Sequence, residues 1–300
     1  MKRSTKAICN SRTAGVGVFE SFRLLVEQVP FLTPVSDTPF VFRPFILLVV
    51  LGCTAGIVGV MVNLRCLEFN AEAMVHSVFP GVVAGAVFGG MDWIIPGAAV
   101  AAVFVTIALV WVRHASEAGT AVVLTSFFAA GVVLSLKFGD RSGQLEALMF
   151  GRLLEVTEVR LRDALIVCAL ALILMVLTWQ RQVFVAFDPH GARAAGINVL
   201  AMDICINVAI AAVVIAASSA IGVLLVIGYL VVPGAAARLL ATNIRTMVPV
   251  AMGVGVFGGY LGLVALTLPG PISPQATVAL SLCALYAVAL LARELKVVSR

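Results

Sequence analysis

The sequence predicts an all-α polytopic membrane protein, a bundle of about eight or nine transmembrane helices with one short cytoplasmic helix. Of the 300 residues, 62% are hydrophobic and only 12% are charged, whereas a soluble domain has about 25% charged residues. The apolar residues also gather in long runs separated by short polar segments. At about 20 residues for each spanning helix, this length leaves little chain for a soluble catalytic domain.

Nine apolar runs are candidate membrane spans. In chain order they are residues 44–62, 73–91, 94–112, 119–136, 163–179, 202–217, 220–237, 247–268 and 275–292. The stretch 202–237 is interrupted only by Ser218-Ser219 and Gly222, so it is either two helices joined by a tight turn or one kinked helix. The first run carries three glycines whose helical spacing predicts a smooth face for close packing: Gly52, Gly56 and Gly59.

The predicted organisation has three parts. Residues 1–40 form an N-terminal arm, partly disordered or lying on the membrane surface, 41–293 form the transmembrane domain, and 294–300 form a cytoplasmic tail. Lys and Arg in short loops favour the cytoplasmic side. This bias places the loop 180–201 and the C-terminus on the cytoplasmic side of a plasma membrane. Nine spans would then leave the basic arm outside. Either the arm crosses the membrane, or residues 16–42 add a surface or entry segment, or the span count is off by one.

Several function classes are excluded by what the sequence lacks. The net charge of +5 is spread along the chain, whereas a nucleic-acid-binding protein has a clustered basic face. The six cysteines show no CxxC spacing and are interpreted as small buried apolar residues. No GxxxxGK[ST] phosphate loop, GxSxG elbow or HExxH pair occurs, so we predict that the chain is not an enzyme. Energy for pumping must come from a partner or from an ion gradient.

The leading candidate site is the pair Glu72 and His76 at the start of the second apolar run. Their i, i+4 spacing places both side chains on one helix face, and ionisable groups inside a span are functional candidates. Carboxylate and imidazole are ligands for divalent transition metals. Two ligands are too few for a stable site, but a two-fold dimer would supply four. Pro80 removes a backbone hydrogen bond beside the pair. The alternative is an interfacial Glu and a His bonded to a neighbouring helix.

The other ionisable candidates have simpler explanations. His114, Glu117 and His190 lie in predicted loops, where solvent accounts for them. Asp203 opens the sixth run, and a carboxylate at a helix N-terminus is stabilised by the helix dipole, so we interpret it as a cap.

The loop 187–198, FDPHGARAAGIN, predicts a short helix of about two turns in the membrane plane. Asp188 is the expected N-cap, Pro189 the first helical residue and Gly196 the terminator. Such a helix is either a surface against which an external motor subunit pushes or a simple connector.

Five segments, spread over residues 40–292 and in the same order, resemble the metal-type ABC importer permeases that take up zinc, manganese or iron. The motif acid, three residues, His-Ala/Ser-x-x-Pro-Gly is filled by Glu72, His76, Ser77, Pro80 and Gly81. The other segments are SEAGTAVVLTSFFAAGVVL (116–134), LEALMFGRLLEVT (145–157), FDPHGARAAGI (187–197) and IGVLLVIGYLVVPGAAARLL (221–240).

The resemblance implies a transmembrane subunit that uses no cofactor of its own. Its implied partners are cytoplasmic ABC ATPase subunits that consume ATP, an extracytoplasmic solute-binding protein, and a second copy or a paralogue in the lipid bilayer. Glu72 and His76 would be metal ligands on the permeation path. The implied coupling residues are Asp188, Pro189, Ala192, Arg193, Ala195 and Gly196.

Two departures leave the cargo open. The acid is usually Asp in the family and here is Glu72, and Val75 stands where Ser usually precedes the His. The alternatives are a permease for a larger cargo, such as an iron chelate, and a gradient-driven carrier that needs no ATPase.

Overall fold

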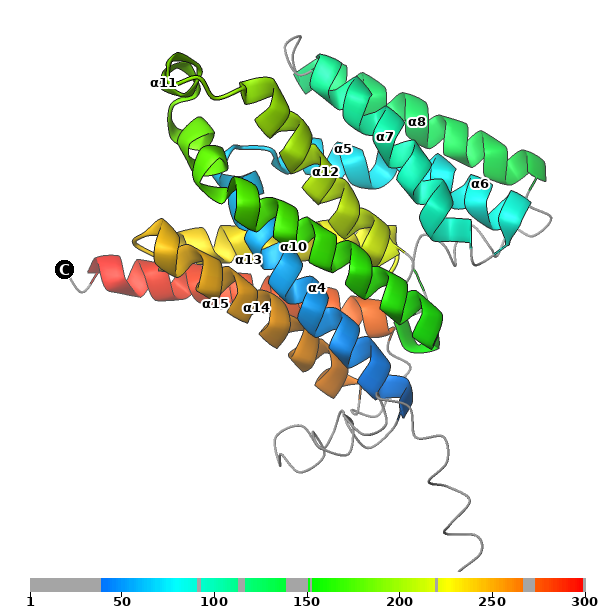
Figure 1. The fold of residues 1–300 in the computed structure, drawn as a ribbon. Coiled ribbons are helices and arrows are strands. Elements are labelled where there is room, and N and C mark those ends of the chain that lie inside the picture. The colour runs from blue at the N-terminus through cyan, green and yellow to red at the C-terminus, as the bar shows by residue number, and fades with distance from the viewer. Residues whose placement is uncertain are drawn as a thin grey trace, which may run out of the picture.

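The structure is a computed structural model that describes residues 39–90, 93–112, 117–138, 151, 153–218, 221–266 and 273–298. All regular elements in these ranges are helices, and they lie side by side in a bundle (Figure 1). The predicted N-terminal arm lies outside the described residues apart from its last two positions.

Each of the nine predicted apolar runs coincides with a helical segment. The helices in chain order are α4 (Pro39–Leu64), α5 (Glu68–Ser77), α6 (Phe79–Gly89), α7 (Ile94–Val112), α8 (Glu117–Phe138), the 3₁₀ turn η2 (Leu153–Glu155), α10 (Glu158–Phe187), α11 (Pro189–Ala194), α12 (Val199–Ser218), α13 (Val223–Leu240), α14 (Ile244–Ala265) and α15 (Pro274–Val298). Eight spans in the described residues, with α5 and α6 counted together, are long and apolar enough to cross a membrane. A shorter apolar segment, Leu225–Leu240 in α13, is the ninth.

The stretch 202–237 is two helices rather than one kinked helix. Helix α12 ends at Ser218 and α13 begins at Val223. Between them Gly222 has φ 78°, a left-handed conformation that glycine adopts without steric cost. The two helices therefore turn back on each other at this residue.

The glycine face of α4 packs directly against other helices, as its spacing predicts. A Cβ atom on Gly52 would lie 2.8 Å from the backbone of Gly255 in α14, and one on Gly59 would overlap the carbonyl oxygen of Leu230 in α13. Small residues allow helix backbones to approach this closely in lipid, where van der Waals packing drives helix association. Helix α4 is thus a central helix of the bundle, and α13 and α14 pack against it (Figure 1).

Gly59→Ala is expected to lower the stability of the bundle by about 1–3 kcal/mol, because the added methyl group must push α13 away. The measurement is the apparent melting temperature of the purified protein. Gly253→Ala is the matched control: no atom lies within 4 Å of a Cβ at this exposed position of α14, so its melting temperature should stay equal or rise slightly. Equal losses in both variants would contradict the packing role of α4.

The two ends of the bundle differ in basic residues. Helix α11, the α13–α14 turn and the C-terminal end of α15 lie at the same end (Figure 1). Described basic residues at this end are Arg65, Arg181, Arg193, Arg238, Arg245 and Arg293, against Arg43, Lys137, Arg160 and Arg162 at the other. Because cytoplasmic loops carry the excess of Lys and Arg, this distribution favours the α11 end as the cytoplasmic end, the orientation expected from the sequence.

Candidate functional site

The second span is broken beside the predicted metal pair. Helix α5 ends at Ser77, Val78 is the junction, and Pro80 lies in the first turn of α6. Pro80 has no N–H to donate to the carbonyl oxygen of His76, four residues earlier. Helix α5 therefore ends one residue after His76, and α6 begins at Phe79, next to the proline that the sequence places beside the pair.

Glu72 and His76 lie one turn apart on α5, on the outer side of the chain. Glu72 is exposed and His76 is partly exposed, whereas Ala73, Met74 and Val75 are buried. The imidazole of His76 packs edge-on against Phe128 of α8, with ring centroids 5.7 Å apart. This contact fixes the ring while leaving part of it open to the outer face.

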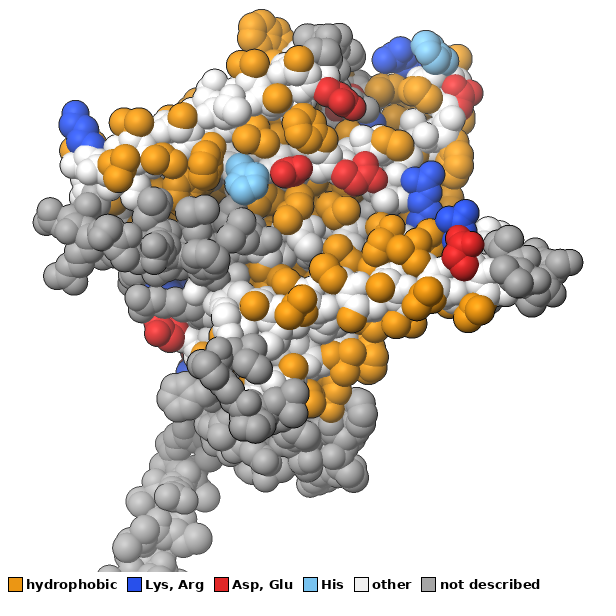
Figure 2. All heavy atoms as spheres, turned by 180° about the vertical axis from the view of Figure 1, so that it is seen from behind, with side chains coloured by type: hydrophobic (Ala, Val, Ile, Leu, Met, Phe, Trp, Pro, Cys, Tyr) orange, Lys and Arg blue, Asp and Glu red, His pale blue; other side chains and the backbone are white. Residues whose placement is uncertain are grey.

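A third ionisable side chain, Glu68, lies on the same helix as Glu72 and His76. Glu68 lies one turn before Glu72 and accepts a hydrogen bond from Asn63 Nδ2 at 3.1 Å. Glu68, Glu72 and His76 thus run along α5 for about 12 Å from its cytoplasmic start. Figure 2 shows acidic side chains and a histidine aligned across a largely apolar face.

The described residues of one chain do not by themselves form a complete metal site. In the part of the chain that the structure describes, no three His, Cys, Asp or Glu side chains are grouped closely enough to hold a metal ion. The pair Glu72 and His76 thus offers two donor groups on one helix face, which is the arrangement that its spacing predicts.

For the remaining ionisable candidates, the structure confirms some interpretations and corrects one. His190 is exposed on α11 and Glu117 is exposed in the first turn of α8, in agreement with solvated positions; His114 lies outside the described residues. The interpretation of Asp203 as a helix cap is wrong. Helix α12 begins at Val199 and is capped by Asn198, whose Oδ1 accepts from the N–H of Ala201 at 3.1 Å. Asp203 lies one turn further in and is buried.

Asp203 forms an ion pair with Arg65, which follows the C-terminus of α4. The side chains of Arg65 and Asp203 are 2% and 5% exposed, and Arg65 Nη2 donates to Asp203 Oδ1. Arg65 Nη1 also donates to Oε1 of Gln182 on α10 at 2.8 Å. The helix-cap interpretation missed this pair because the two residues are 138 positions apart. Opposite charges at the same predicted end of two apolar runs are the signal that could have found it.

The ion pair belongs to a larger polar network at the α11 end of the bundle. Asn70 Nδ2 of α5 donates to Asn207 Oδ1 of α12 at 2.6 Å, and Gln182 Nε2 donates to the carbonyl oxygen of Met202 at 2.8 Å. Arg238 of α13 donates to Asn63 Oδ1 at 3.1 Å. Buried polar groups need such partners because their desolvation is costly.

The loop 187–198 contains the predicted short helix, α11. The side chain of Asp188 accepts from the N–H of Gly191 at 2.8 Å, Pro189 occupies the first helical position, and Gly196 has φ 79°. Ala192 is fully buried against Val185 of α10 and Met202 of α12. The remaining predicted coupling residues, Pro189, Arg193, Ala195, Gly196 and Asp188, are exposed. The helix is therefore anchored to the bundle through Ala192, and its other side is exposed.

Known proteins are similar to this chain in sequence or in fold. The manganese transport system membrane protein MntC of Listeria monocytogenes is 27% identical over 237 residues, 78% of this chain and 84% of the relative. The chelated iron transport system membrane protein YfeD of Yersinia pestis is 27% identical over 241 residues, 79% of this chain and 80% of the relative. The solved structure of PsaBC from Streptococcus pneumoniae in complex with Fab has the same fold, with a TM-score of 0.76 at 23% identity over 86% of this chain and 94% of that one.

The model of the ABC 3 transport family matches residues 37–293, nearly the whole of the described bundle. With eight spans in its described part that are long and apolar enough to cross a membrane, the chain is a multi-pass protein of the plasma membrane. It belongs to the ABC 3 transport family.

Proposed function

We propose that this chain is the permease subunit of an ATP-driven importer of divalent transition-metal ions. Separate cytoplasmic ATPase subunits supply the energy, and an extracytoplasmic binding protein delivers the ion. The family match and the relatives named for manganese and chelated-iron transport support this class. The observation that carries the proposal is the Glu72–His76 pair, exposed on one face of the broken second span.

The donor atoms of this pair suit first-row divalent ions. A carboxylate oxygen favours Mn²⁺, and an imidazole nitrogen favours Zn²⁺ and Fe²⁺, whereas Cu⁺ prefers thiolate or thioether sulfur. A transported ion needs ligands that bind it weakly enough for release, and a small, incomplete ligand set has that property.

The exposure of the pair supports a second permease chain. A charged side chain that faces lipid is costly, and intramembrane ionisable groups almost always face a bundle interior or a water-filled cavity. On one chain alone, Glu72 is exposed beside the poorly buried helix α8, of which 17% is buried. A second copy or a paralogue packed on this face would cover it and would bring a second Glu–His pair to the path.

The cytoplasmic end supports the ATPase partner. Helix α11 projects from the bundle between α10 and α12 and is exposed on its outer side (Figure 1). A short capped helix anchored in this way transfers a push from an external subunit to two long helices at once. Asp188, Pro189, Arg193, Ala195 and Gly196 are the residues proposed to meet that subunit, and Ala192 is proposed to hold the helix in place.

The proposal predicts ATP-dependent Mn²⁺ uptake by liposomes that contain the permease, its ATPase subunits and its binding protein. Uptake should stop when ATP is replaced by a non-hydrolysable analogue, because no other energy source is present. Excess Zn²⁺ or Fe²⁺ should compete if the site accepts them. Uptake that continues without ATP and follows an ion gradient would contradict the ATPase-driven mechanism. Transport of a metal chelate but of no free ion would contradict the proposed cargo.

A further inference from the structure

The buried ion pair between Arg65 and Asp203 lies between the two parts of the molecule that the proposed function must connect. Arg65 is in the three-residue link from α4 to α5, directly before the helix that carries Glu72 and His76. Asp203 is on α12, one residue after Met202, against which α11 packs through Ala192. The pair therefore joins the base of α11 to the start of α5.

A second contact ties the same two helices one turn further into the bundle. Asn70 of α5 donates to Asn207 of α12 at 2.6 Å, and Asn207 Nδ2 donates to the carbonyl oxygen of Asp203 at 2.8 Å. The two contacts, spaced by one helical turn on α12, form a ladder. A ladder of two rungs constrains both the position and the rotation of α5 relative to α12, which one contact would not do.

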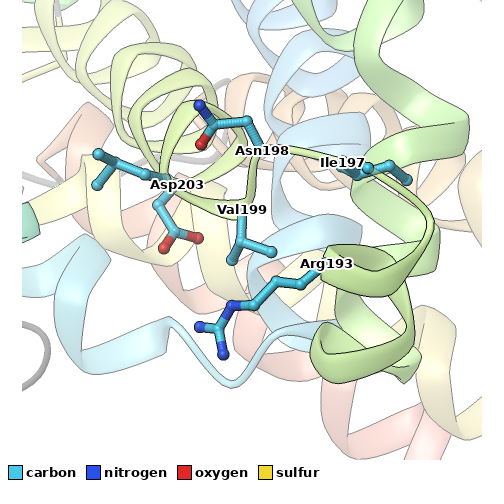
Figure 3. A pocket seen from close by; sticks show the side chains of 7 residues that line it. Arg193, Ile197, Asn198, Val199 and Asp203 are labelled. Carbon is cyan, nitrogen blue, oxygen red and sulfur yellow. The ribbon is translucent and has the colours of Figure 1, made fainter.

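The ladder also borders the space beneath α11. Figure 3 shows Arg193 of α11 and Asp203 of α12 lining the same pocket, and Arg65 and Pro189 line a neighbouring one together with both of these residues. Displacement of α11 thus changes the surroundings of the ion pair before it changes anything near His76. Gln182 of α10 holds Arg65 on the other side, at 2.8 Å from Nη1.

We propose that the Arg65–Asp203 ion pair and the Asn70–Asn207 hydrogen bond are positioning elements that convert movement of α11 into movement of α5. This inference rests on the proposed function, since it concerns how ATP hydrolysis reaches the Glu72–His76 pair. Neither contact includes Glu72 or His76. Both contacts act through α5, and coupling of this kind needs a physical two-ended link rather than mere proximity.

The test uses the complete complex in liposomes and measures Mn²⁺ imported for each ATP hydrolysed. The double variant Arg65→Met/Asp203→Leu replaces both charges by apolar side chains, a change that buried pairs often tolerate, whereas removal of one partner is strongly destabilising. The variant is expected to assemble with the ATPase and to hydrolyse ATP, but to import about tenfold less Mn²⁺ per ATP, within the usual range of coupling between sites.

The matched control is Arg43→Met/Glu158→Leu. Arg43 pairs with Glu158 at 2.6 Å near the other end of α4, also linking it to a neighbouring helix, and this pair is exposed. Its Mn²⁺ to ATP ratio should equal that of the wild type. If the test variant keeps the wild-type ratio, or if both variants lose it equally, the ion pair is not a coupling element.

A second variant guards against misfolding of the first. Asn70→Leu/Asn207→Leu removes the other rung without touching a charge, and it should also lower the ratio. If this variant keeps the wild-type ratio of Mn²⁺ imported to ATP hydrolysed, the Asn70–Asn207 hydrogen bond does not have the proposed coupling role. A wild-type complex that imports no Mn²⁺ at the expense of ATP would overturn the proposed function and this inference together, whereas failure of the inference alone leaves wild-type import intact.

Discussion

His76→Ala is expected to lower ATP-driven Mn²⁺ uptake by about a hundredfold or more. Groups that only hydrogen-bond to metal ligands already contribute about 10–100-fold to metal affinity or activity, and His76 is proposed to be a ligand itself. In a homodimer each substitution also removes two ligands. The protein should still fold, because His76 is partly exposed and its main contact is the ring of Phe128. Uptake of Mn²⁺ and the melting temperature are measured on the same preparation.

Glu72→Gln should have a comparable effect, because an amide oxygen carries no negative charge for the ion. Glu68→Gln is the matched control on the same helix, one turn away. Gln keeps an oxygen that can accept the hydrogen bond now donated by Asn63, so uptake should change little. Wild-type uptake by both His76→Ala and Glu72→Gln would remove the metal path from α5, while leaving the permease class intact.

The acid at position 72 also bears on selectivity. Glu72→Asp introduces the acid that the resemblance to metal-type permeases leads one to expect at this position, and it shortens the side chain by one methylene group. If Glu72 is a ligand, the carboxylate then reaches a different point of the path, and the ratio of Mn²⁺ to Zn²⁺ uptake should change while total uptake remains measurable.

The helices of this bundle could be predicted from the sequence because lipid imposes one rule along the whole chain. Backbone groups in a bilayer must be satisfied within the segment, so each long apolar run has to be a helix. The same reasoning reached the break at Pro80 and the helix after Asp188, where proline and a capping carboxylate fix the backbone locally. These features depend on residues within one or two turns of each other.

The polar network could not be predicted in this way. Contacts join Arg65 to Gln182 and to Asp203 only because α4, α10 and α12 pack together. No local sequence pattern indicates which loop residue contacts which helix. Asp203 near the start of an apolar run has the features of a cap, but Asn198 fills that role. The second half of the metal site is a still harder case, since it is proposed to come from another chain.

Ala192→Arg is expected to abolish ATP-driven uptake, with a loss of about a hundredfold, while the bundle remains folded. Ala192 is fully buried between Val185 and Met202, and an arginine there carries a charge and a long side chain into a space that holds one methyl group. A buried unpaired charge is not tolerated, so α11 must move away from its packing position against α10 and α12. Because α11 packs at the edge of the bundle, the structural change should be confined to α11 and the helix ends that contact it.

The measurement combines Mn²⁺ uptake, ATP hydrolysis and copurification of the ATPase subunit. Ala192→Ser is the matched control, because it adds one oxygen atom at the same position and should keep most of the uptake. The purified permease should still bind Mn²⁺ in both variants, since neither substitution removes Glu72 or His76. If Ala192→Arg keeps normal uptake, α11 is a connector rather than the point at which ATP hydrolysis acts. If it loses Mn²⁺ binding as well, the substitution has disrupted the bundle, and its effect on uptake says nothing about coupling.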